Sequence, residues 1–401
     1  MTTKITDVQL RDAIGNSNGS YSAAAKVLGI PKSTLFDHIN KDADMKKYRQ
    51  EVKDLQKRRD VANTNRRQTR KNNRVENLVE SLESEMIKLL KDNKIKPGKT
   101  EHIPRNGNSL GIIALNDLHI NEVIDLPNNK FNLEIASRAI HKHIRMCLRE
   151  FKAYDVSKVL FTFLGDLVNS DRRMDEAMTN ATNRSKAMLV AAQVLSSAIA
   201  DVSQYYPVMV ASVVGNESRV NKDLGFVDVI ASDSYDLAIH RIMENMFDGN
   251  ERVEFLPMTD SLECVIECSG RNILLHHGHT AKGGLLNDTT KRISRYAAQG
   301  VNLDLVLSGH IHEACIADIY ARGGGLPGAN AYSEKGLNLR SRRSQNSYIL
   351  EEGQTGWHGF KHDLQDVQDF EPYPYNESLD SENSMYDRVD RQGTTVFKIV
   401  I

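Results

Sequence analysis

The sequence has few of the features that mark secreted or membrane-spanning proteins. Its 401 residues include four cysteines, nine prolines and one tryptophan. No apolar run approaches the roughly 20 residues needed to cross a bilayer, and the opening MTTKITDVQLRD carries charges where a secretory signal has an apolar core. The cysteines lie in apolar stretches without the spacing of a zinc site, so we expect buried, reduced thiols at Cys147, Cys264, Cys268 and Cys315. These absences predict a cytoplasmic protein with no membrane partner.

Charge is distributed unevenly along the chain. The formal net charge is −1, but residues 1–100 hold 22 Lys+Arg and 13 Asp+Glu, a net charge of +9. Residues 101–401 therefore carry a net charge of −10. A chain of this length accommodates two or three domains. The asymmetry predicts that its two parts meet different partners, the basic part a polyanion.

Residues 1–43 predict a small all-α module of three short helices, at 7–14, at 21–28 and from Lys32 onward. The segment GNSNGSYSAAAKVLGIPKSTLFDHINK resembles a Fis-type helix-turn-helix through Gly15-Asn16, Ala23-Ala24-Ala25, Leu28-Gly29-Ile30 and Ser33-Thr34-Leu35. The resemblance implies that the third helix enters the DNA major groove. The contacts that it implies are Lys32, Ser33, Thr34 and His38. A three-helix bundle that binds protein is the alternative.

Residues 44–100 predict a long helical linker without internal proline or glycine until Pro97. Its basic stretch, 57–74, is almost devoid of apolar groups, so it is either a solvated linker or an arm along phosphates. DNA contact is therefore expected through residues 1–75. Over residues 75–90, apolar side chains recur at three- and four-residue steps. That stripe predicts docking on the following domain or a homodimer.

From residue 101 onward, apolar strands alternate with helices, which predicts an α/β domain with layered, mixed sheets. The expected strands are 112–115, 158–164, 208–214, 253–255, 262–266, 272–275, 303–307, 347–350 and 396–401. The expected helices are 132–151, 183–204, 226–246 and 291–299.

Five of these strands are followed directly by residues that bind metals. The loops are Asn116-Asp117-Leu118-His119, Gly165-Asp166, Gly215-Asn216, His276-His277-Gly278-His279 and Gly309-His310-Ile311-His312. We expect these side chains to converge, because the carboxyl ends of parallel strands meet at one edge of a sheet. Mixed His, Asp and Asn ligands suit manganese, iron or zinc better than calcium.

In this order, the five loops resemble those of the calcineurin-like metallophosphoesterases throughout residues 110–320. The resemblance implies a metallophosphoesterase sandwich over residues 101–401 that holds two divalent metal ions, most readily Mn²⁺, with Fe or Zn as alternatives. It implies that Asp117, His119 and His312 hold one ion and that Asn216, His277 and His310 hold the other. Asp166 bridges the two ions.

The chain departs from the family after Asn216, where the family has a histidine that serves as general acid. Here Glu217 stands at that position, so protonation of the leaving group falls to Glu217 with a raised pKa, to His279, or is dispensable. Arg219 is the expected substitute phosphate contact. His276 is expected to pack against or orient His277. The expected catalytic residues are Asp166, Asn216, Glu217, Arg219 and His279.

Two later segments carry weaker signals. The glycine-rich stretch 323–333, with the basic cluster 340–343, predicts either a surface loop or a lid that grips substrate. The acidic stretch 364–392 predicts a loose excursion. The glycine-rich loop also resembles loops of tailed-bacteriophage proteins, which implies the bacterial host cytoplasm as location.

Together these features predict a metal-dependent phosphodiesterase, a nuclease acting on DNA that its helix-turn-helix recruits. One alternative is a small-substrate phosphatase or cyclic-nucleotide phosphodiesterase. Another is a DNA-binding regulator with a non-catalytic metal site.

Overall fold

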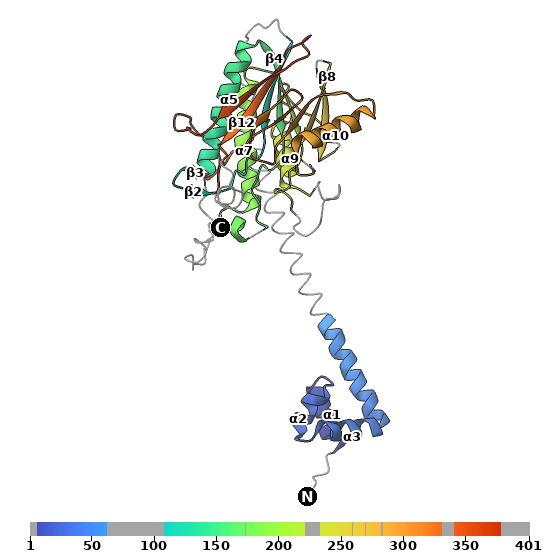
Figure 1. The fold of residues 1–401 in the computed structure, drawn as a ribbon. Coiled ribbons are helices and arrows are strands. Elements are labelled where there is room, and N and C mark those ends of the chain that lie inside the picture. The colour runs from blue at the N-terminus through green and yellow to red at the C-terminus, as the bar shows by residue number, and fades with distance from the viewer. Residues whose placement is uncertain are drawn as a thin grey trace. The chain divides into compact units, whose positions relative to one another are not determined.

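The computed structural model describes residues 6–61, 108–172, 174–220, 233–258, 260–268, 270–281, 284–330 and 341–377. The chain divides into two compact units, Met1–Asp92 and Asn93–Ile401, which are described separately (Figure 1). The predicted apolar stripe at 75–90 and the predicted strand 396–401 lie outside the described residues.

The N-terminal unit consists of the three predicted short helices and a fourth helical segment at residues 43–61. The helices are α1 (Asp7–Asn16), α2 (Tyr21–Leu28) and α3 (Lys32–Lys41). Thr6 and Gln9 form a capping box at the start of α1, which satisfies backbone N–H groups that the helix leaves unpaired. Gly29 ends α2 with φ 67°, a left-handed conformation that glycine adopts without strain.

One small apolar core holds these helices together. It is formed by Leu10, Ala13, Ile14, Ala24, Ala25, Leu35, Ile39 and Met45. Leu35 and Ile39 lie on the buried face of α3. The predicted DNA contacts occupy other positions of the helix and are exposed: Lys32, Ser33, Thr34 and His38. The guanidinium of Arg49 lies 3.6 Å from the Tyr21 ring centroid, and this contact ties the fourth segment to α2.

Leu35→Ala should lower the free energy of unfolding of the N-terminal unit by about 2–5 kcal/mol, because Leu35 is fully buried in a small core. Calorimetry of the full chain should show a lower unfolding temperature for this unit and an unchanged unfolding temperature for the C-terminal unit. Val27→Ala, at a site 66% exposed, is the control and should shift neither. Equal shifts of both transitions would contradict the division into two units.

Two mixed sheets form the C-terminal unit. The first has the order β13-β12-β1-β4-β5-β6, and the second has the order β10-β11-β9-β8-β7. In the first sheet, β1 (Ser109–Leu115), β4 (Val156–Phe163), β5 (Val208–Ser212) and β6 (Val253–Phe255) are parallel, while β12 (Ser344–Leu350) and β13 (His358–Asp363) are antiparallel additions. The second sheet contains β7 (Glu263–Cys268), β8 (Arg271–His276), β9 (Leu303–Ser308), β10 (Cys315–Ile316) and β11 (Tyr320–Arg322). The predicted α/β architecture with mixed sheets is confirmed.

The sheets face each other across an apolar core. Leu110, Ile112 and Ala114 of β1 pack in one cluster with Ile273 and Leu275 of β8. The other face of the first sheet is covered by α5 (Leu133–Ala153) and α7 (Arg184–Ser203), and α9 (Tyr235–Met246) packs on α7. On the second sheet, α10 (Leu285–Ala297) contacts β9 (Figure 1). The short hairpin of β2 (Ile124–Leu126) and β3 (Asn129–Phe131) precedes α5, and α6 (Met174–Met178) precedes α7.

Among the described helices, α7 is long and apolar enough to cross a membrane by length and composition, a property that its sequence was not expected to have. Two-thirds of its most apolar window, 67%, is buried inside the unit. The apolar side chains of α7 therefore belong to the core.

The structure corrects several element boundaries. Ser234 caps α9, so this helix begins at Tyr235, and the expected start at 226 lies outside the described residues. The helix α10 begins at Leu285, six residues before the predicted start, and β13 was not predicted. The described part of the acidic segment, 364–377, is packed, with Leu364, Val367 and Tyr373 buried, so it is not a loose excursion there. Of the cysteines, Cys147 is buried and the other three are half-buried.

Candidate metal centre

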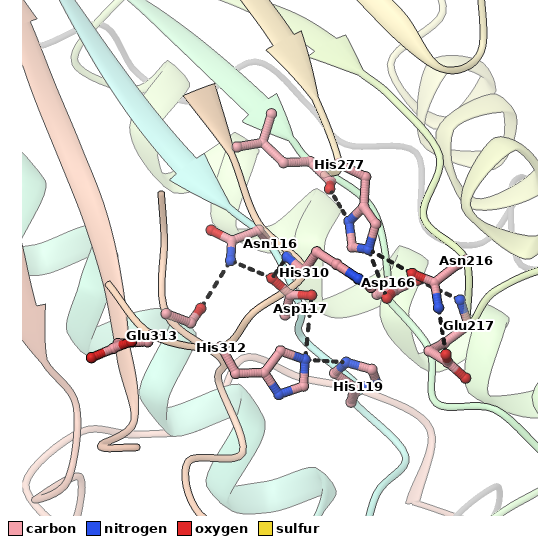
Figure 2. Close-up of polar contacts among 12 residues, drawn as sticks. Asn116, Asp117, His119, Asp166, Asn216, Glu217, His277, His310, His312 and Glu313 are labelled. Atoms are coloured by element: carbon pink, nitrogen blue, oxygen red, sulfur yellow. Dashed lines mark hydrogen bonds and ion pairs between the residues drawn. The ribbon is translucent and has the colours of Figure 1, made fainter. Parts of the chain in front are cut away.

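The loops after β1, β4, β5, β8 and β9 bring all seven predicted ligands together (Figure 2). Donor atoms of Asp117, His119 and His312 lie within 4.8 Å of one another, and so do those of Asp166, His277 and His310. Side chains from distant parts of the chain therefore form two adjacent groups of metal-binding atoms.

The backbone of these loops is held in an unfavourable conformation. Of the seven non-glycine residues with positive φ in the described chain, five are predicted ligands: Asp117 (47°), His119 (39°), Asp166 (54°), His310 (77°) and His312 (60°). Left-handed backbone costs free energy in residues with a Cβ, and it persists where the surroundings enforce it, typically at functional sites. The surrounding fold therefore holds the backbone of these five predicted ligands in a strained conformation.

In the first group, two imidazole nitrogens and a carboxylate oxygen lie close together. His119 Nδ1 lies 3.1 Å from Asn169 Oδ1, which can only accept, so the proton of the neutral ring is on Nδ1 and the lone pair is on Nε2. That Nε2 is 3.1 Å from His312 Nε2, which is 3.4 Å from Asp117 Oδ1. This donor set suits a divalent transition metal ion.

Asp117 is oriented by its second oxygen. Its Oδ2 accepts hydrogen bonds from the backbone N–H of His310 (2.8 Å) and from Asn116 Nδ2 (2.7 Å). Its Oδ1 is buried, and the described residues give it only a long contact, with His312 Nε2 at 3.4 Å. A buried carboxylate oxygen with so weak a partner is costly unless a cation compensates it, so this oxygen fits a metal ligand.

In the second group, three acceptors face one another. His277 Nδ1 donates to the carbonyl of Leu164 (2.7 Å), which leaves the lone pair of the neutral ring on Nε2. That Nε2 is 2.9 Å from Asp166 Oδ2 and 3.1 Å from Asn216 Oδ1. Three acceptors repel one another at these distances unless a positive charge lies among them. That charge is either a bound cation or a second proton on the His277 ring.

The pKa values report the same charge balance. Burial alone would lower the pKa of His277, but the Asp166 carboxylate outweighs burial and raises it to about 10. Burial likewise opposes ionisation of Asp166, yet His277 holds the pKa of this carboxyl well below its usual range. Without a metal ion, His277 therefore keeps a second proton, and this proton occupies the position that a cation would take.

Metal-stripped protein should lose stability as the pH rises from about 6.5 to 10. A raised folded-state pKa means that this stability is fully present below the unfolded value and lost through the folded value, at up to about 1.4 kcal/mol per pH unit. Denaturant unfolding in chelator should show this slope in the parent and not in His277→Gln. Equal slopes in both would refute the assignment of the proton to His277.

Asp236, in the first turn of α9, orders two ligand loops and was missed in the sequence. Its carboxylate accepts hydrogen bonds from the backbone N–H groups of Asp166 (3.0 Å), Leu167 (3.0 Å) and Gly215 (2.8 Å). Burial and the nearby Asp166 charge raise its pKa. The loops approach so closely that a Cβ on Gly215 would overlap the Asp166 carboxylate. No motif marks Asp236, because it lies far along the chain from the loops it binds.

Glu217, which replaces the family histidine, positions Asn216. Its Oε1 accepts a hydrogen bond from Asn216 Nδ2, so the amide oxygen of Asn216 is turned toward His277. Its Oε2 lies 2.6 Å from Arg172 Nη2. The two oxygens of Glu217 are thus engaged by Asn216 and Arg172, and these contacts give no support to its expected general-acid role.

The remaining predicted catalytic residues line the same region. The ring centroid of His279 lies 5.4 Å from that of His277 and 6.2 Å from that of His310. Burial and His277 lower the pKa of His279 to about 3. Arg219 Nε donates to the carbonyl of Asn216 (2.8 Å). His276 is buried, and burial lowers its pKa to about 3, as for a packed neutral ring.

The predicted lid is a buried support in its described part. Residues 323–329 are almost entirely buried, and the carbonyl of Gly324 accepts hydrogen bonds from Asn116 Nδ2 (2.9 Å) and Gln345 Nε2 (2.9 Å). The backbone N–H of Leu326 donates to the Asp117 carbonyl (3.0 Å). Arg343 of the basic cluster is also buried among backbone carbonyls. The stretch therefore supports the Asp117 loop through hydrogen bonds to Asn116 and Asp117. Residues 331–340 lie outside the described chain.

Known proteins give no sequence match: no family model and no curated protein matches the chain. Solved structures with a related arrangement include zinc-complexed Vps29 from Entamoeba histolytica (11% identity, TM-score 0.28, 63% of this chain and 99% of that one). Others are a predicted phosphoesterase from Streptococcus pneumoniae (12%, 0.28, 66% and 94%) and the calcineurin-like phosphoesterase YfkN from Bacillus subtilis (10%, 0.30, 66% and 94%). Similarity at this level assigns no role to any residue, so the site rests on its own geometry.

Proposed function

We propose that the C-terminal unit is a two-metal phosphoesterase that hydrolyses phosphodiesters. The observation that carries the proposal is that Asp166, a member of the second ligand group with His277, also interacts electrostatically with His119 of the first group. Two cations about 3.5–4 Å apart repel each other and need an anionic group between them. When bound, such ions supply Lewis acidity that activates water and stabilises charge on phosphoryl oxygens.

Each residue then has a defined task. Asp117, His119 and His312 would hold the first ion, Asn216, His277 and His310 would hold the second, and Asp166 would contact both. Manganese suits this nitrogen and oxygen donor set, with iron and zinc as alternatives.

Two arginines beside Asn216 supply the phosphate contacts in this proposal. Arg172, which the sequence did not single out, and Arg219 are half-buried near Glu217. Guanidinium groups bind non-bridging phosphate oxygens through paired hydrogen bonds. His279, beside His277 and His310, is the remaining side chain of the set for contact with the leaving oxygen.

The substrate that we propose is DNA, recruited by the N-terminal unit. Support comes from the net charge of +9 over residues 1–100 and from the exposed positions of Lys32, Ser33, Thr34 and His38 on α3. Tethering a weak DNA-binding module to an active site raises the local substrate concentration to roughly millimolar. The net charge of −10 on the rest of the chain makes such recruitment useful.

The test compares two substrates with one set of variants in manganese. Parent protein should cleave plasmid DNA and a chromogenic phosphodiester. The triple variant Lys32→Ala, Ser33→Ala and Thr34→Ala should lose at least about tenfold in DNA cleavage, because its phosphate contacts are gone, with the chromogenic rate unchanged. Equal rates on DNA for parent and triple variant would refute recruitment through α3.

One observation favours a small-substrate enzyme as the second candidate. Glu217 is paired with Arg172, which speaks against a general-acid role for the residue after Asn216. An ester with a good leaving group needs no protonation. Hydrolysis of a chromogenic or cyclic phosphodiester, with intact DNA under the same conditions, would support this candidate. No hydrolysis of any ester, together with tight DNA binding, would support a regulator.

A further inference from the structure

A second cluster of metal-binding side chains lies between α5 and the edge strand β13. His143 and Cys147 are four residues apart on α5 and share one helix face, and His362 projects from β13. All three are buried. The two Nδ1 atoms of the histidines are 2.8 Å apart, and Cys147 Sγ lies 3.9 Å from each of them.

The protonation of His362 leaves a lone pair directed into this cluster. Its Nε2 lies 2.8 Å and 3.0 Å from the two carboxylate oxygens of Glu150, which can only accept. Glu150 is held in turn by Ser347 Oγ (2.6 Å). The proton of the neutral ring is therefore on Nε2 and the lone pair on Nδ1. A carboxylate that fixes the outer nitrogen of a histidine is the usual support of a metal-bound imidazole.

We propose that His143, Cys147 and His362 bind a zinc ion, with Glu150 as the positioning residue for His362. Zinc bond lengths place two nitrogen donors about 3.3 Å apart and nitrogen about 3.6 Å from sulfur in a tetrahedral site. The observed 2.8 Å and 3.9 Å differ from these by a few tenths of an ångström. Ser347 Oγ, within hydrogen-bond reach of the thiol and of Glu150, is the candidate oxygen for the fourth position.

Charge balance supports the assignment. A zinc ion, a thiolate and two neutral imidazoles carry a net charge of +1, which the Glu150 carboxylate beside them neutralises. Without a cation, burial raises the pKa of Cys147 well above and lowers the pKa of His143 well below the ordinary value. The ion would cross-link α5 to β13, which among the described strands pairs only with β12.

Cobalt substitution of the full chain tests the proposal. A thiolate bound to Co²⁺ gives a near-ultraviolet charge-transfer band, and none of the seven ligands of the dinuclear centre contains sulfur. The band should appear in the parent, remain in Cys264→Ser and disappear in Cys147→Ser. Metal analysis should find one equivalent less in Cys147→Ser than in the parent.

Glu150→Gln keeps the thiol and should weaken cobalt binding at this band by about 10–100-fold. This variant keeps the test decisive if Cys147→Ser fails to fold. A folded parent with no band, and with the same metal content as Cys147→Ser, would overturn the proposal and leave a hydrogen-bonded histidine pair. Neither outcome depends on hydrolysis, so the cluster is tested separately from the phosphoesterase proposal.

Discussion

Asp166→Asn should lower manganese-dependent hydrolysis of a chromogenic phosphodiester by about 10³-fold, equivalent to about 4 kcal/mol of transition-state stabilisation. The Asp166 carboxylate is buried in the second ligand group and lies 2.9 Å from His277 Nε2. An amide has the same shape but lacks the charge that offsets the repulsion of two cations. Initial rates and metal content of parent and variant measure the effect.

The control for this variant is Asp125→Asn, an exposed aspartate of the β2–β3 hairpin whose ion pair with Lys130 is also exposed. Its rate should equal that of the parent, because exposed pairs contribute little. A folded Asp166→Asn protein that retains two metal ions and the parent rate would contradict the assignment of Asp166 as the bridge.

Asp236→Ala should lower the free energy of unfolding by about 3–5 kcal/mol and abolish hydrolysis. The substitution leaves three buried backbone N–H groups, of Asp166, Leu167 and Gly215, without their acceptor. Since two of these groups belong to ligand loops, the geometry of the metal centre should be lost with the stability.

Asp236→Asn distinguishes charge from hydrogen bonding. An amide oxygen replaces only one of the two accepting oxygens, so stability and rate should fall between those of parent and Asp236→Ala. The matched control is Asp233→Asn, at an exposed position just before α9. Urea unfolding measures the stability of each variant, and metal titration measures its metal affinity. Parent-like metal affinity in Asp236→Ala would show that Asp236 does not hold the loops.

The sequence predicts much of the C-terminal fold because the central strands of its sheets are buried on both faces. β1 is buried at every position, so it reads as a continuous apolar run. The ligands are predictable for a related reason, since each follows such a strand directly. His277, for example, comes immediately after β8.

The supporting residues are not predictable in the same way. Asn169 acts through one hydrogen bond and Asp236 through three, all to loops distant in sequence, and no spacing rule connects donor and acceptor. The cluster of His143, Cys147 and His362 was missed because His362 lies on β13. The sequence of this strand, HGFKHD, is polar and does not show the apolar pattern that predicts a strand. The glycine-rich stretch 323–329 was misread because glycine signals both flexibility and close packing, and here Gly323 contacts Asn116 too tightly for a Cβ.

Anomalous scattering from manganese-loaded crystals measures the central geometry directly. We expect two peaks about 3.5–4 Å apart, the first beside Asp117, His119 and His312, the second beside His277 and His310, with Asp166 contacting both. A single peak, or two peaks of which only one touches Asp166, would contradict the two-metal centre.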